Sequence, residues 1–537
     1  MTNDSQSNLI LPRRFLRMCR RRMRAPKVAD STGVELTGAS LLTRALLVRR
    51  LLRRAAPGGP NGQRIGVLLP PSAACVVVNA ALSIDCRVAV NLNYTVTSEV
   101  MNACLAQCGI RYVVTSRRVM ERFNLNLDAE MVYLEDLLGT ITTADKLLAA
   151  GMAWLAPIPW LERHLGLTEV KDDDLLTVIF TSGSTGQPKG VMLTQRNVAS
   201  NVTAVDQVIR LAPDDVLLGI LPIFHSFGYT TTMWTVLSLP PKGIYHFSPL
   251  EAREVGKLCR KHGATIMVTT PTFVRSYLRR CEPEDFAALD VVFTGAERLT
   301  PELADAFEQR FGVRPVEGYG TTELSPVVSA NIPPSRAATA ASEGIKAGTI
   351  GRTLPGVSAK IVDLETGEDL GAGHSGMLLV TGPNVMKGYY GRPDLTAEVM
   401  RGPWYVTGDV AEMDDEGFIT ITGRISRFSK LAGEMVPHIR VEEAIAQVLK
   451  LDEDELKIAV TSVPDAKKGE RLVVLYTELS QSPEEICRAL AAGGLPSLWI
   501  PSHDSFRRVD EIPVLGTGKL DLRHLKDLAL DEFMQTA

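Results

Sequence analysis

Apolar runs alternate with amphipathic, helix-like segments along most of this chain. A short apolar run at Val291–Phe293 is followed by a helical pattern over Pro301–Phe311. The same alternation extends from Val28 to about Gly423. Strands that alternate with helices favour α/β layers built on a largely parallel sheet.

The pattern changes after Gly423. The remainder of the chain has its own strand-like runs, Lys457–Val460 and Leu472–Leu479, together with further helical segments. We expect a small second domain there, and no internal repeat or low-complexity tract is evident.

Two long uncharged stretches approach the length of a membrane span. Ile65–Ile84 contains Pro70 and Pro71, a pattern typical of a buried strand, a turn and a helix. Val216–Pro241 is broken by proline, histidine, glycine and several hydroxyl residues, so a lipid-facing helix is not expected. No signal-peptide apolar region opens the chain, so we expect a cytoplasmic protein.

The first residues form a basic, amphipathic pattern. Seven arginines fall between Arg13 and Arg24, and apolar residues recur at helical spacing at Leu11, Phe15, Leu16, Cys19 and Met23. We interpret residues 1–27 as a segment outside the large domain. It could lie on an anionic membrane surface, form a solvated linker helix, or be a transit peptide.

Length and charge narrow the function classes. The chain has 537 residues, 45% of them hydrophobic, which is enough for more than one core. Its 58 basic and 62 acidic residues give a net charge of −4, which offers no overall argument for nucleic-acid binding. Eight scattered cysteines lack a CxxC pair or a neighbouring histidine cluster, so reduced, buried thiols are expected rather than a metal site.

The stretch Thr181–Gly190, TSGSTGQPKG, carries the first chemical signal. It follows the apolar strand Leu175–Phe180 and combines glycines, hydroxyl residues and a lysine. Such a loop lets main-chain N–H groups approach a polyphosphate. It differs from the GxxxxGK[ST] loop because Pro188 precedes Lys189 and a glycine follows it. The stretch therefore predicts a nucleotide-using enzyme.

A GxGxxG string at Gly371, Gly373 and Gly376 does not predict a dinucleotide site. It follows the polar segment TGEDL rather than an apolar strand. We interpret it as a turn.

Four later motifs make the loop at 181–190 more specific. They are EGYGTTE at Glu317–Glu323, YVTGD at Tyr405–Asp409, GR at Gly423–Arg424 and GTGKLD at Gly516–Asp521. In this order the motifs resemble the adenylate-forming superfamily of acyl synthetases, adenylation domains and luciferases. The resemblance implies a large multi-sheet α/β N-terminal domain, residues 28–423, and a small mobile α+β domain, residues 424–537.

The resemblance also implies a two-step reaction that uses ATP and Mg²⁺. A carboxylate attacks the α-phosphate of ATP to give an acyl-adenylate and pyrophosphate, and a thiol then takes the acyl group. Like unit charges about 4 Å apart repel by about 4 kcal/mol at an effective dielectric constant of about 20. The site must therefore supply positive charge.

Site residues follow from the resemblance, position by position. The nucleotide-binding residues would be Thr181, Ser182, Gly183, Ser184, Thr185, Gly186 and Lys189 at the phosphates, Gly295, Ala296, Glu297, Tyr319, Gly320 and Thr321 around adenine, and Asp409 at the ribose. The catalytic residues would be Lys519, Thr322, Glu323 and Arg424, with Glu323 and Thr181 at the metal. Ser426 occupies the hinge position, where the family commonly has an acidic residue.

The segment Leu221–Trp234, LPIFHSFGYTTTMW, resembles the wall of the family's acyl pocket. His225, Phe227, Gly228 and Trp234 are its candidate pocket residues, and their apolar surroundings favour a long fatty acid. His225 is interpreted as a wall or gate, because a carboxylate that is already ionised needs no base.

A closer resemblance indicates the acceptor of the acyl group. Phe428–Val436, FSKLAGEMV, is similar to the acyl-carrier-protein synthetase half of bifunctional 2-acylglycerophosphoethanolamine acyltransferases of phospholipid metabolism, although the HxxxxD motif of the acyltransferase is absent. Acyl carrier protein is therefore the first expectation and coenzyme A the alternative. A non-catalytic lipid or nucleotide sensor on the same fold is the third hypothesis.

Overall fold

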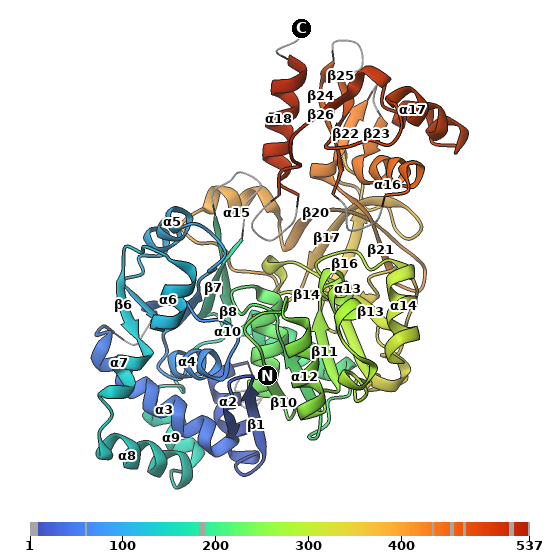
Figure 1. Ribbon diagram of the computed structural model, residues 1–537. Coiled ribbons are helices and arrows are strands. Elements are labelled where there is room, and N and C mark those ends of the chain that lie inside the picture. The colour runs from blue at the N-terminus through green and yellow to red at the C-terminus, as the bar shows by residue number, and fades with distance from the viewer. Residues whose placement is uncertain are drawn as a thin grey trace.

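The computed structural model in Figure 1 comprises a large N-terminal body and a smaller C-terminal domain at one end. The structure describes residues 9–59, 62–181, 188–431, 434–451, 456–465, 469–514 and 520–534. Six predicted site residues lie outside these ranges: Ser182, Gly183, Ser184, Thr185, Gly186 and Lys519.

The first sheet of the large domain has a parallel centre and antiparallel edges. Its strand order is β15-β14-β13-β12-β11-β9-β10-β1-β2, and the strands from β13 to β1 pair in parallel. The bounds are β1 (Pro26–Asp30), β2 (Glu35–Thr37), β9 (Val216–Gly219), β10 (Lys242–Tyr245), β11 (Ile266–Thr269), β12 (Val291–Thr294), β13 (Pro315–Gly320), β14 (Val327–Ala330) and β15 (Arg352–Thr353).

Two further sheets complete the large domain. The second runs β18-β8-β7-β4-β3-β5-β6, with β3 (Arg64–Val67), β4 (Val88–Asn91), β5 (Tyr112–Thr115), β6 (Glu130–Tyr133), β7 (Leu175–Thr181), β8 (Lys189–Thr194) and β18 (Gly388–Tyr389). The third is antiparallel and contains β16 (Ser358–Val362), β17 (Ser375–Thr381), β19 (Met400–Arg401), β20 (Trp404–Met413) and β21 (Ile419–Arg424). The predicted multi-sheet α/β body is therefore confirmed.

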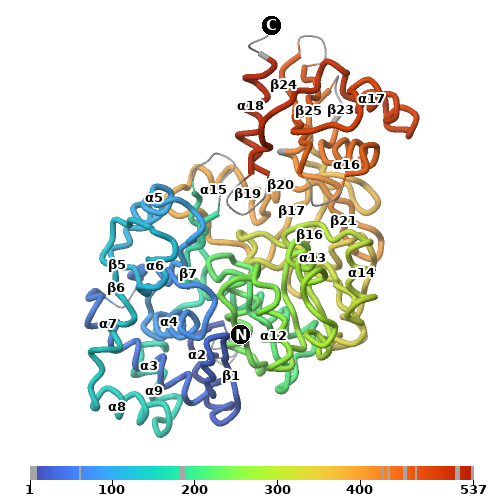
Figure 2. The backbone as a smooth tube through the Cα atoms, in the orientation of Figure 1, coloured from blue at the N-terminus to red at the C-terminus, as the bar shows by residue number. Residues whose placement is uncertain are grey.

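The C-terminal domain packs helices on a separate sheet. Its strands are β22 (Phe428–Leu431), β23 (Glu434–Pro437), β24 (Ile458–Asp465), β25 (Gly469–Tyr476) and β26 (Phe506–Arg508), and its helices are α16 (His438–Leu449), α17 (Pro483–Ala492) and α18 (Leu522–Met534). Figure 2 shows this α+β unit as the orange-to-red end of the chain. The last strand of the large domain ends at Arg424, one residue past the predicted boundary.

Helices cover the sheets of the large domain. They are α2 (Leu11–Arg21), α3 (Gly38–Ala55), α4 (Ala73–Ser83), α5 (Ser98–Cys108), α6 (Arg117–Phe123), α7 (Leu134–Gly139), α8 (Thr143–Trp154), α9 (Ile158–His164), α10 (Gln195–Val208), α11 (Thr235–Ser238), α12 (Ala252–His262), α13 (Pro271–Arg280), α14 (Pro301–Phe311) and α15 (Pro393–Val399). Within the described ranges, no helix is both long and apolar enough to span a membrane.

Helix α14 shows how local signals fix an element. The Thr300 hydroxyl accepts a hydrogen bond from Leu303 N at 3.4 Å, Pro301 occupies the first turn, and Gly312 ends the helix with φ 76°. These are the start and stop signals that favour a helix in any context. The predicted bounds, Pro301–Phe311, match the observed ones.

Helix α2 corrects the interpretation of the basic N-terminal segment. Leu11, Phe15 and Leu16 are fully buried in the main core of the large domain. Arg13 and Arg17 form ion pairs with the buried Glu162 on α9. The helix is therefore part of the large domain rather than a linker, because its apolar side already has a protein partner.

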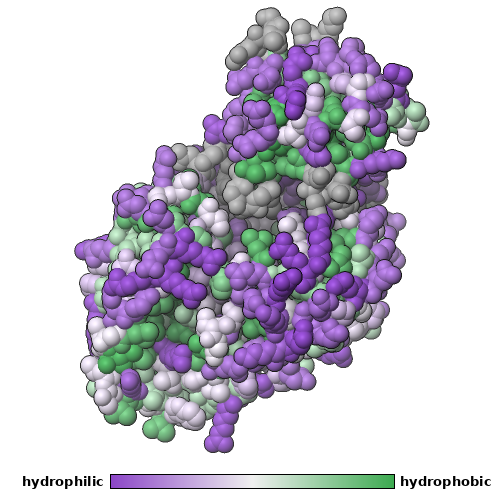
Figure 3. Space-filling view, viewed as in Figure 1, coloured by the Kyte–Doolittle hydropathy of each residue, from purple (hydrophilic) through white to green (hydrophobic). Residues whose placement is uncertain are grey.

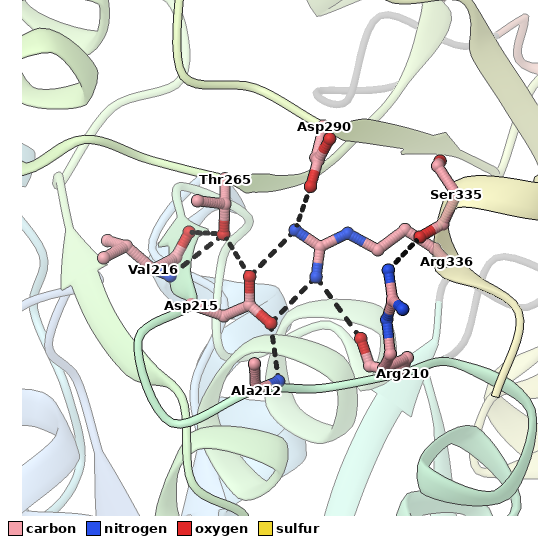
Figure 4. A network of polar contacts seen from close by, with 8 residues as sticks. All are labelled: Arg210, Ala212, Asp215, Val216, Thr265, Asp290, Ser335 and Arg336. Carbon is pink, nitrogen blue, oxygen red and sulfur yellow. Dashed lines mark hydrogen bonds and ion pairs between the residues drawn. The ribbon is translucent and has the colours of Figure 1, made fainter.

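A polar network centred on the buried Arg336–Asp215 pair holds the first sheet at the amino ends of its parallel strands. Asp215, Thr265 and Asp290 each directly precede one of three neighbouring strands, β9, β11 and β12. Arg336 donates to both oxygens of Asp215 at 2.8 Å and to Asp290 at 2.7 Å, while Thr265 donates to Asp215 at 2.7 Å (Figure 4). One guanidinium therefore links two of the strand starts directly and a third through Thr265.

Candidate active site

A cavity of about 2710 Å³ opens at the carboxyl ends of the first sheet's parallel strands. Drug-sized ligands occupy pockets of about 300–1,000 Å³, so this volume has room for more than one ligand. Ligands in open α/β sheets bind at this edge of the sheet. The lining includes Asp521 and Arg523 of the C-terminal domain, so both domains contribute to it.

The two residues that flank the undescribed part of the predicted phosphate loop lie on paired strands. Thr181, the last residue of β7, pairs with Lys189, the first residue of β8, and both line the cavity. Lys189 Nζ lies 5.3 Å from the centre of the Tyr389 ring, close enough for a cation–π contact. The structure therefore holds the lysine at the base of the loop by strand pairing and an aromatic face.

Asp409, Tyr319 and Arg424 form a connected group on the cavity wall. Tyr319 Oη donates a hydrogen bond to Asp409 Oδ2, and Arg424 Nε lies 3.4 Å from Oδ1. Burial raises the pKa of Asp409, an effect that Arg424 and Tyr319 partly offset. Burial, reinforced by Asp409, raises the pKa of Tyr319 well above its usual value, so its hydroxyl stays a donor. This carboxylate is a buried acceptor suited to a pair of hydroxyls.

The segment after β13 presents hydroxyl groups to the same space. Ser226 Oγ donates to Thr322 Oγ1 at 3.1 Å, which joins the two cavity walls. Thr321 Oγ1 is buried and has no hydrogen-bond partner within the described structure. Because a buried hydroxyl without a partner is costly, Thr321 favours a ligand that supplies one. At Gly320 a Cβ atom would lie 1.9 Å from Pro326 O, so only glycine fits.

Glu323 is the best candidate for a magnesium ligand in the cavity. Tyr389 Oη donates to Glu323 Oε1 at 2.8 Å, which leaves other lone pairs of the carboxylate free. Across the described ranges no group of three or more His, Cys, Asp or Glu residues could hold a metal by itself. Mg²⁺ often binds through one carboxylate together with substrate phosphates, so Glu323, with Thr181 on the same cavity, fits this mode.

The predicted adenine wall, Gly295–Glu297, lies immediately after β12 and lines the cavity. Gly295 is in close contact with Phe227, since an added Cβ would lie 3.2 Å from its Cζ. Ala296 has a left-handed backbone, φ 70°, which is uncommon outside glycine and clusters at functional sites. Glu297 accepts hydrogen bonds from Thr272 N and Oγ1 at 3.1 and 2.7 Å, which fixes the segment to the start of α13.

The proposed acyl segment is only partly on the cavity. His225 and Phe227 line it, as predicted, but Gly228 and Trp234 do not. Trp234 is fully buried in the core, 6.3 Å edge-to-face from Tyr229. At Gly228 a Cβ would lie 2.4 Å from Pro222 O, so this glycine permits a close backbone contact. Neither residue lines the cavity, although Thr231 of the same π-helix, Gly228–Trp234, does.

Sequence reasoning missed several lining residues. Thr231 and Thr235, spaced one helical turn apart, face the cavity. Apolar side chains from α4, α5 and α6 extend the lining away from the nucleotide residues: Val77, Val78, Val100, Met101, Cys104, Val119 and Phe123. The turn spacing of the threonines was a usable signal, but the contribution of α4–α6 depends on how the two sheets pack.

The hinge prediction concerns the short connection between the domains. Ser426 lies in the 3-10 turn Ile425–Arg427, directly after β21. Arg427 then pairs with Glu442 on α16, inside the C-terminal domain. Across the domains Arg298 Nη1 lies 2.6 Å from Glu443 Oε1. The turn is therefore the covalent link between the units, and its role as a hinge stays a prediction.

Comparison with known proteins agrees with this geometry. The profile of the AMP-binding enzyme family matches residues 15–390. The chain is 29% identical over 523 residues to a long-chain-fatty-acid–CoA ligase of Bacillus subtilis (92% of this chain, 90% of the relative) and 30% identical over 371 residues to that of Yersinia pestis (67% and 62%). ATP-bound MatB from Rhodopseudomonas palustris shares the fold, with TM-score 0.79, 24% identity and coverage of 98% and 100%.

The chain therefore belongs to the AMP-binding enzyme family, the adenylate-forming superfamily. Its class is that of the AMP-forming acid–thiol ligases. The match to the family begins inside α2, which agrees with the inclusion of that helix in the large domain.

Proposed function

We propose that the protein is a long-chain fatty acyl-CoA synthetase. It would activate a fatty acid with ATP as an acyl-adenylate and then transfer the acyl group to the thiol of coenzyme A. The main support is the continuity of one cavity: the wall that carries Tyr319, Thr322 and Asp409 runs into the apolar lining from α4, α5 and α6.

The described residues supply distinct parts of this chemistry. Asp409 would accept the ribose hydroxyls, and Tyr319 would lie against adenine beside Gly295–Glu297. Thr322 would meet the α-phosphate, where the fatty carboxylate attacks, and Arg424 would offset the negative charge that gathers there. Glu323 would hold Mg²⁺, which when bound screens the phosphate charge and orients the leaving pyrophosphate.

Lys519, on the C-terminal domain, would orient the carboxylate and the α-phosphate during adenylate formation. The residue is outside the described ranges, but its neighbours Leu520 and Asp521 line the same cavity. This placement supports an approach of the lysine from the C-terminal domain.

The names of the relatives favour coenzyme A over acyl carrier protein, which reverses the order expected from the sequence. Those from Bacillus subtilis and Yersinia pestis are both named long-chain-fatty-acid–CoA ligases. Coenzyme A therefore becomes the first candidate and acyl carrier protein the second. Peripheral membrane contact through Arg13–Arg24 loses its basis, since several of these arginines are engaged within the large domain.

An acceptor assay tests the proposal directly. Fatty acids of increasing chain length are offered with ATP and Mg²⁺, and coenzyme A and acyl carrier protein are supplied in parallel. We expect pyrophosphate release and a thioester with coenzyme A, with long chains preferred. A thioester with carrier protein alone would reverse the acceptor assignment. No adenylate with any acid would instead favour a non-catalytic lipid or nucleotide-binding role.

A further inference from the structure

The cavity has a polar end that is rich in arginine and lies away from the nucleotide residues. We call it the distal end and define it by its lining residues: Ser31, Thr32, Arg118, Arg122 and Phe247–Leu250. Leu250 is 64% exposed, so the cavity reaches the protein surface here. Figure 3 shows hydrophilic side chains over α6 and, beside them, a recess with hydrophobic side chains near α4. A polar end does not suit the terminal methyl group of an ordinary fatty chain.

The distal end lies about one long acyl chain away from the proposed reaction centre. Phe247 follows β10 and Thr322 follows β13, and the two strands are four apart in the order β13-β12-β11-β9-β10. With neighbouring strands about 4.8 Å apart, the two positions are separated by about 19 Å. This is about the span of an extended chain of 16 carbons with C–C bonds of about 1.5 Å. A fatty acid whose carboxylate reacts beside Thr322 would therefore place its other end here.

An aromatic wall connects the two positions. The ring of Phe224 meets that of Tyr94 edge-to-face, and Tyr94 in turn stacks on Phe123, with 4.8 Å between ring centres in each pair. All three side chains line the cavity. Phe123 is adjacent to Arg122 in the sequence, so the apolar wall ends at an arginine.

Arg122 is held with its donor groups available. Its guanidinium carbon lies 5.0 Å from the centre of the Phe247 ring and 5.8 Å from that of Phe123. A guanidinium stacked on an aromatic ring keeps the N–H groups of its edge for a planar acceptor. Glu251 Oε1 lies 3.9 Å from Arg122 Nη2, beyond hydrogen-bond distance, and Glu251 Oε2 lies 3.3 Å from His246 Nε2. Arg122 can therefore bind a further carboxylate through two N–H groups.

Arg118 adds a second cation on the same side of α6. It precedes Arg122 by four residues, which places the two side chains on one face of the helix, and both line the cavity. Like charges at this spacing repel each other, so an anion bound between them would be stabilising.

The charge of the distal end is positive. Among the lining residues before Phe293, the charged side chains are those of Asp30, Arg44, Arg118, Arg122 and Lys189. Lys189 belongs to the nucleotide side of the cavity. Asp30 is buried, and its two carboxylate oxygens accept hydrogen bonds from Thr32 N and Ala73 N, at 2.9 Å each.

The other acidic residues on and beside α6 do not line the cavity. Asp136 pairs with Arg117 at 2.8 Å, and Glu254 pairs with Lys257 at 2.7 Å. Glu135 accepts a hydrogen bond from Arg117 N at 3.0 Å. None of the following described acids is among the lining residues: Glu121, Glu135, Asp136, Glu251 and Glu254. The arginines therefore outnumber the carboxylates that face a ligand at this end.

We propose that the protein activates long-chain α,ω-dicarboxylic acids, with the second carboxylate bound by Arg118 and Arg122 at the distal end. The first carboxylate reacts beside Thr322, and the chain follows the aromatic wall between the two positions. This inference rests on the proposed function, because it names the class of fatty acid that the same site takes.

Pyrophosphate release with matched acids tests the inference. Hexadecanoate and hexadecanedioate are each offered with ATP, Mg²⁺ and coenzyme A, and the readout is the ratio of kcat/KM for the diacid to kcat/KM for the monoacid. We expect hexadecanedioate to be used at least as well as hexadecanoate, and added salt to lower the ratio because it screens the arginines. Decanedioate should be a poor substrate, since its second carboxylate would stop within the apolar part of the cavity.

Arg122→Gln should lower the ratio about tenfold, because it removes a charged donor from the second carboxylate. A general loss of activity in the variant cancels in the ratio. Arg118→Gln combined with Arg122→Gln should lower the ratio further. Arg253→Gln is the matched control, since Arg253 is exposed on α12 and does not line the cavity. Equal unfolding temperatures would show that the variants are folded.

The outcomes separate this inference from the proposed function. Turnover of hexadecanoate without turnover of hexadecanedioate would overturn the inference alone. So would an equal ratio in Arg122→Gln and Arg253→Gln, which would leave the arginines without a role in selecting a second carboxylate. No pyrophosphate release with either acid would instead overturn the proposed function.

Discussion

Asp409 and Arg424 lie directly opposite each other on the antiparallel strands β20 and β21, with Arg424 Nε 3.4 Å from Asp409 Oδ1. Burial raises the pKa of Asp409, which favours its protonated form. The positive charge of Arg424 beside it lowers that pKa again and so favours the carboxylate. Tyr319 contacts the other oxygen from β13. The group is thus assembled before a nucleotide binds, and each carboxylate oxygen keeps a lone pair for a ligand.

Replacing Asp409 should weaken nucleotide binding without unfolding the protein. Asp409→Asn keeps an oxygen for Tyr319 but removes the charge, and one charged hydrogen bond contributes about 1.5–3 kcal/mol. We expect the KM for ATP to rise by about 10–100-fold. Steady-state pyrophosphate release measures this. Asp394→Asn, on the exposed start of α15, is the matched control, and an equal change in both variants would contradict the assignment.

Glu323→Gln should change the magnesium requirement. The amide oxygen can still accept from Tyr389, but a neutral ligand holds Mg²⁺ less well. We expect the magnesium concentration for half-maximal rate to rise about tenfold or more. Tyr389→Phe separates the metal role from packing, since it removes only the hydroxyl. A magnesium dependence that stays the same in Glu323→Gln would remove Glu323 from the metal site.

Lys519→Ala should separate the two half-reactions. Loss of a donor that acts only in the transition state costs about 10²–10³-fold in rate. We expect that loss in adenylate formation, followed by pyrophosphate exchange, while thioester formation from supplied acyl-adenylate is nearly unchanged. An equal loss in both half-reactions would count against this role.

Arg336→Met should destabilise the large domain. Removing the guanidinium leaves the buried carboxylate of Asp215 without its ion pair, at a cost of about 3–5 kcal/mol. Denaturant unfolding measures the loss. Because the network lies at the strand starts, opposite the cavity, the KM for ATP of the folded variant should change little. Asp305→Asn, in an exposed pair with Arg314, serves as the control and should cost under about 1 kcal/mol.

His438 should make the C-terminal domain sensitive to acid. Burial, together with Arg427 and Lys526, lowers its pKa to about 3, against about 6.5 when unfolded. As the pH falls, the unfolded state therefore binds a proton before the folded state does. The stability that the neutral His438 contributes is complete above pH 6.5 and is lost as the pH falls toward 3. At pH 5 the loss is about 2 kcal/mol.

Calorimetry of the C-terminal transition between pH 7 and pH 5 tests this. His438→Gln should flatten the pH dependence, because no group that titrates in this range remains at the position. The exposed His503→Gln is the control and should keep the dependence of the unaltered protein. Parallel curves for His438→Gln and the unaltered protein would refute the prediction.

Elements with complete local signals could be predicted from the sequence. The cap of Thr300, the proline at 301 and the glycine at 312 defined α14 to the residue. The strand Leu175–Phe180 was likewise found, with one residue more at its end. The sequence predicted helix α2 as amphipathic. Which elements cover its apolar side depends on its packing against α3 and α9, and α9 is more than a hundred residues away along the chain.

Some site residues could likewise be predicted from short motifs, whereas others depended on how the elements pack. The motifs placed Tyr319, Glu323 and Asp409 in one family pattern, and the structure brings them to one cavity. Trp234 was assigned to the pocket but is buried in the core, because successive residues of a helix point in different directions around its axis and only one side of this helix lines the cavity. Spacing alone did not settle which side of the segment faced the cavity.

The sequence by itself determined the family, the order of its motifs and the main elements, because capping residues, apolar periodicity and short motifs act locally. Only the tertiary structure decided that the basic helix α2 is internal, that β20 and β21 bring Arg424 to Asp409, and that α6 brings Arg122 to the Phe247 ring after β10. Those outcomes depend on how separate elements pack against one another, and packing is a property of surfaces rather than of neighbouring residues.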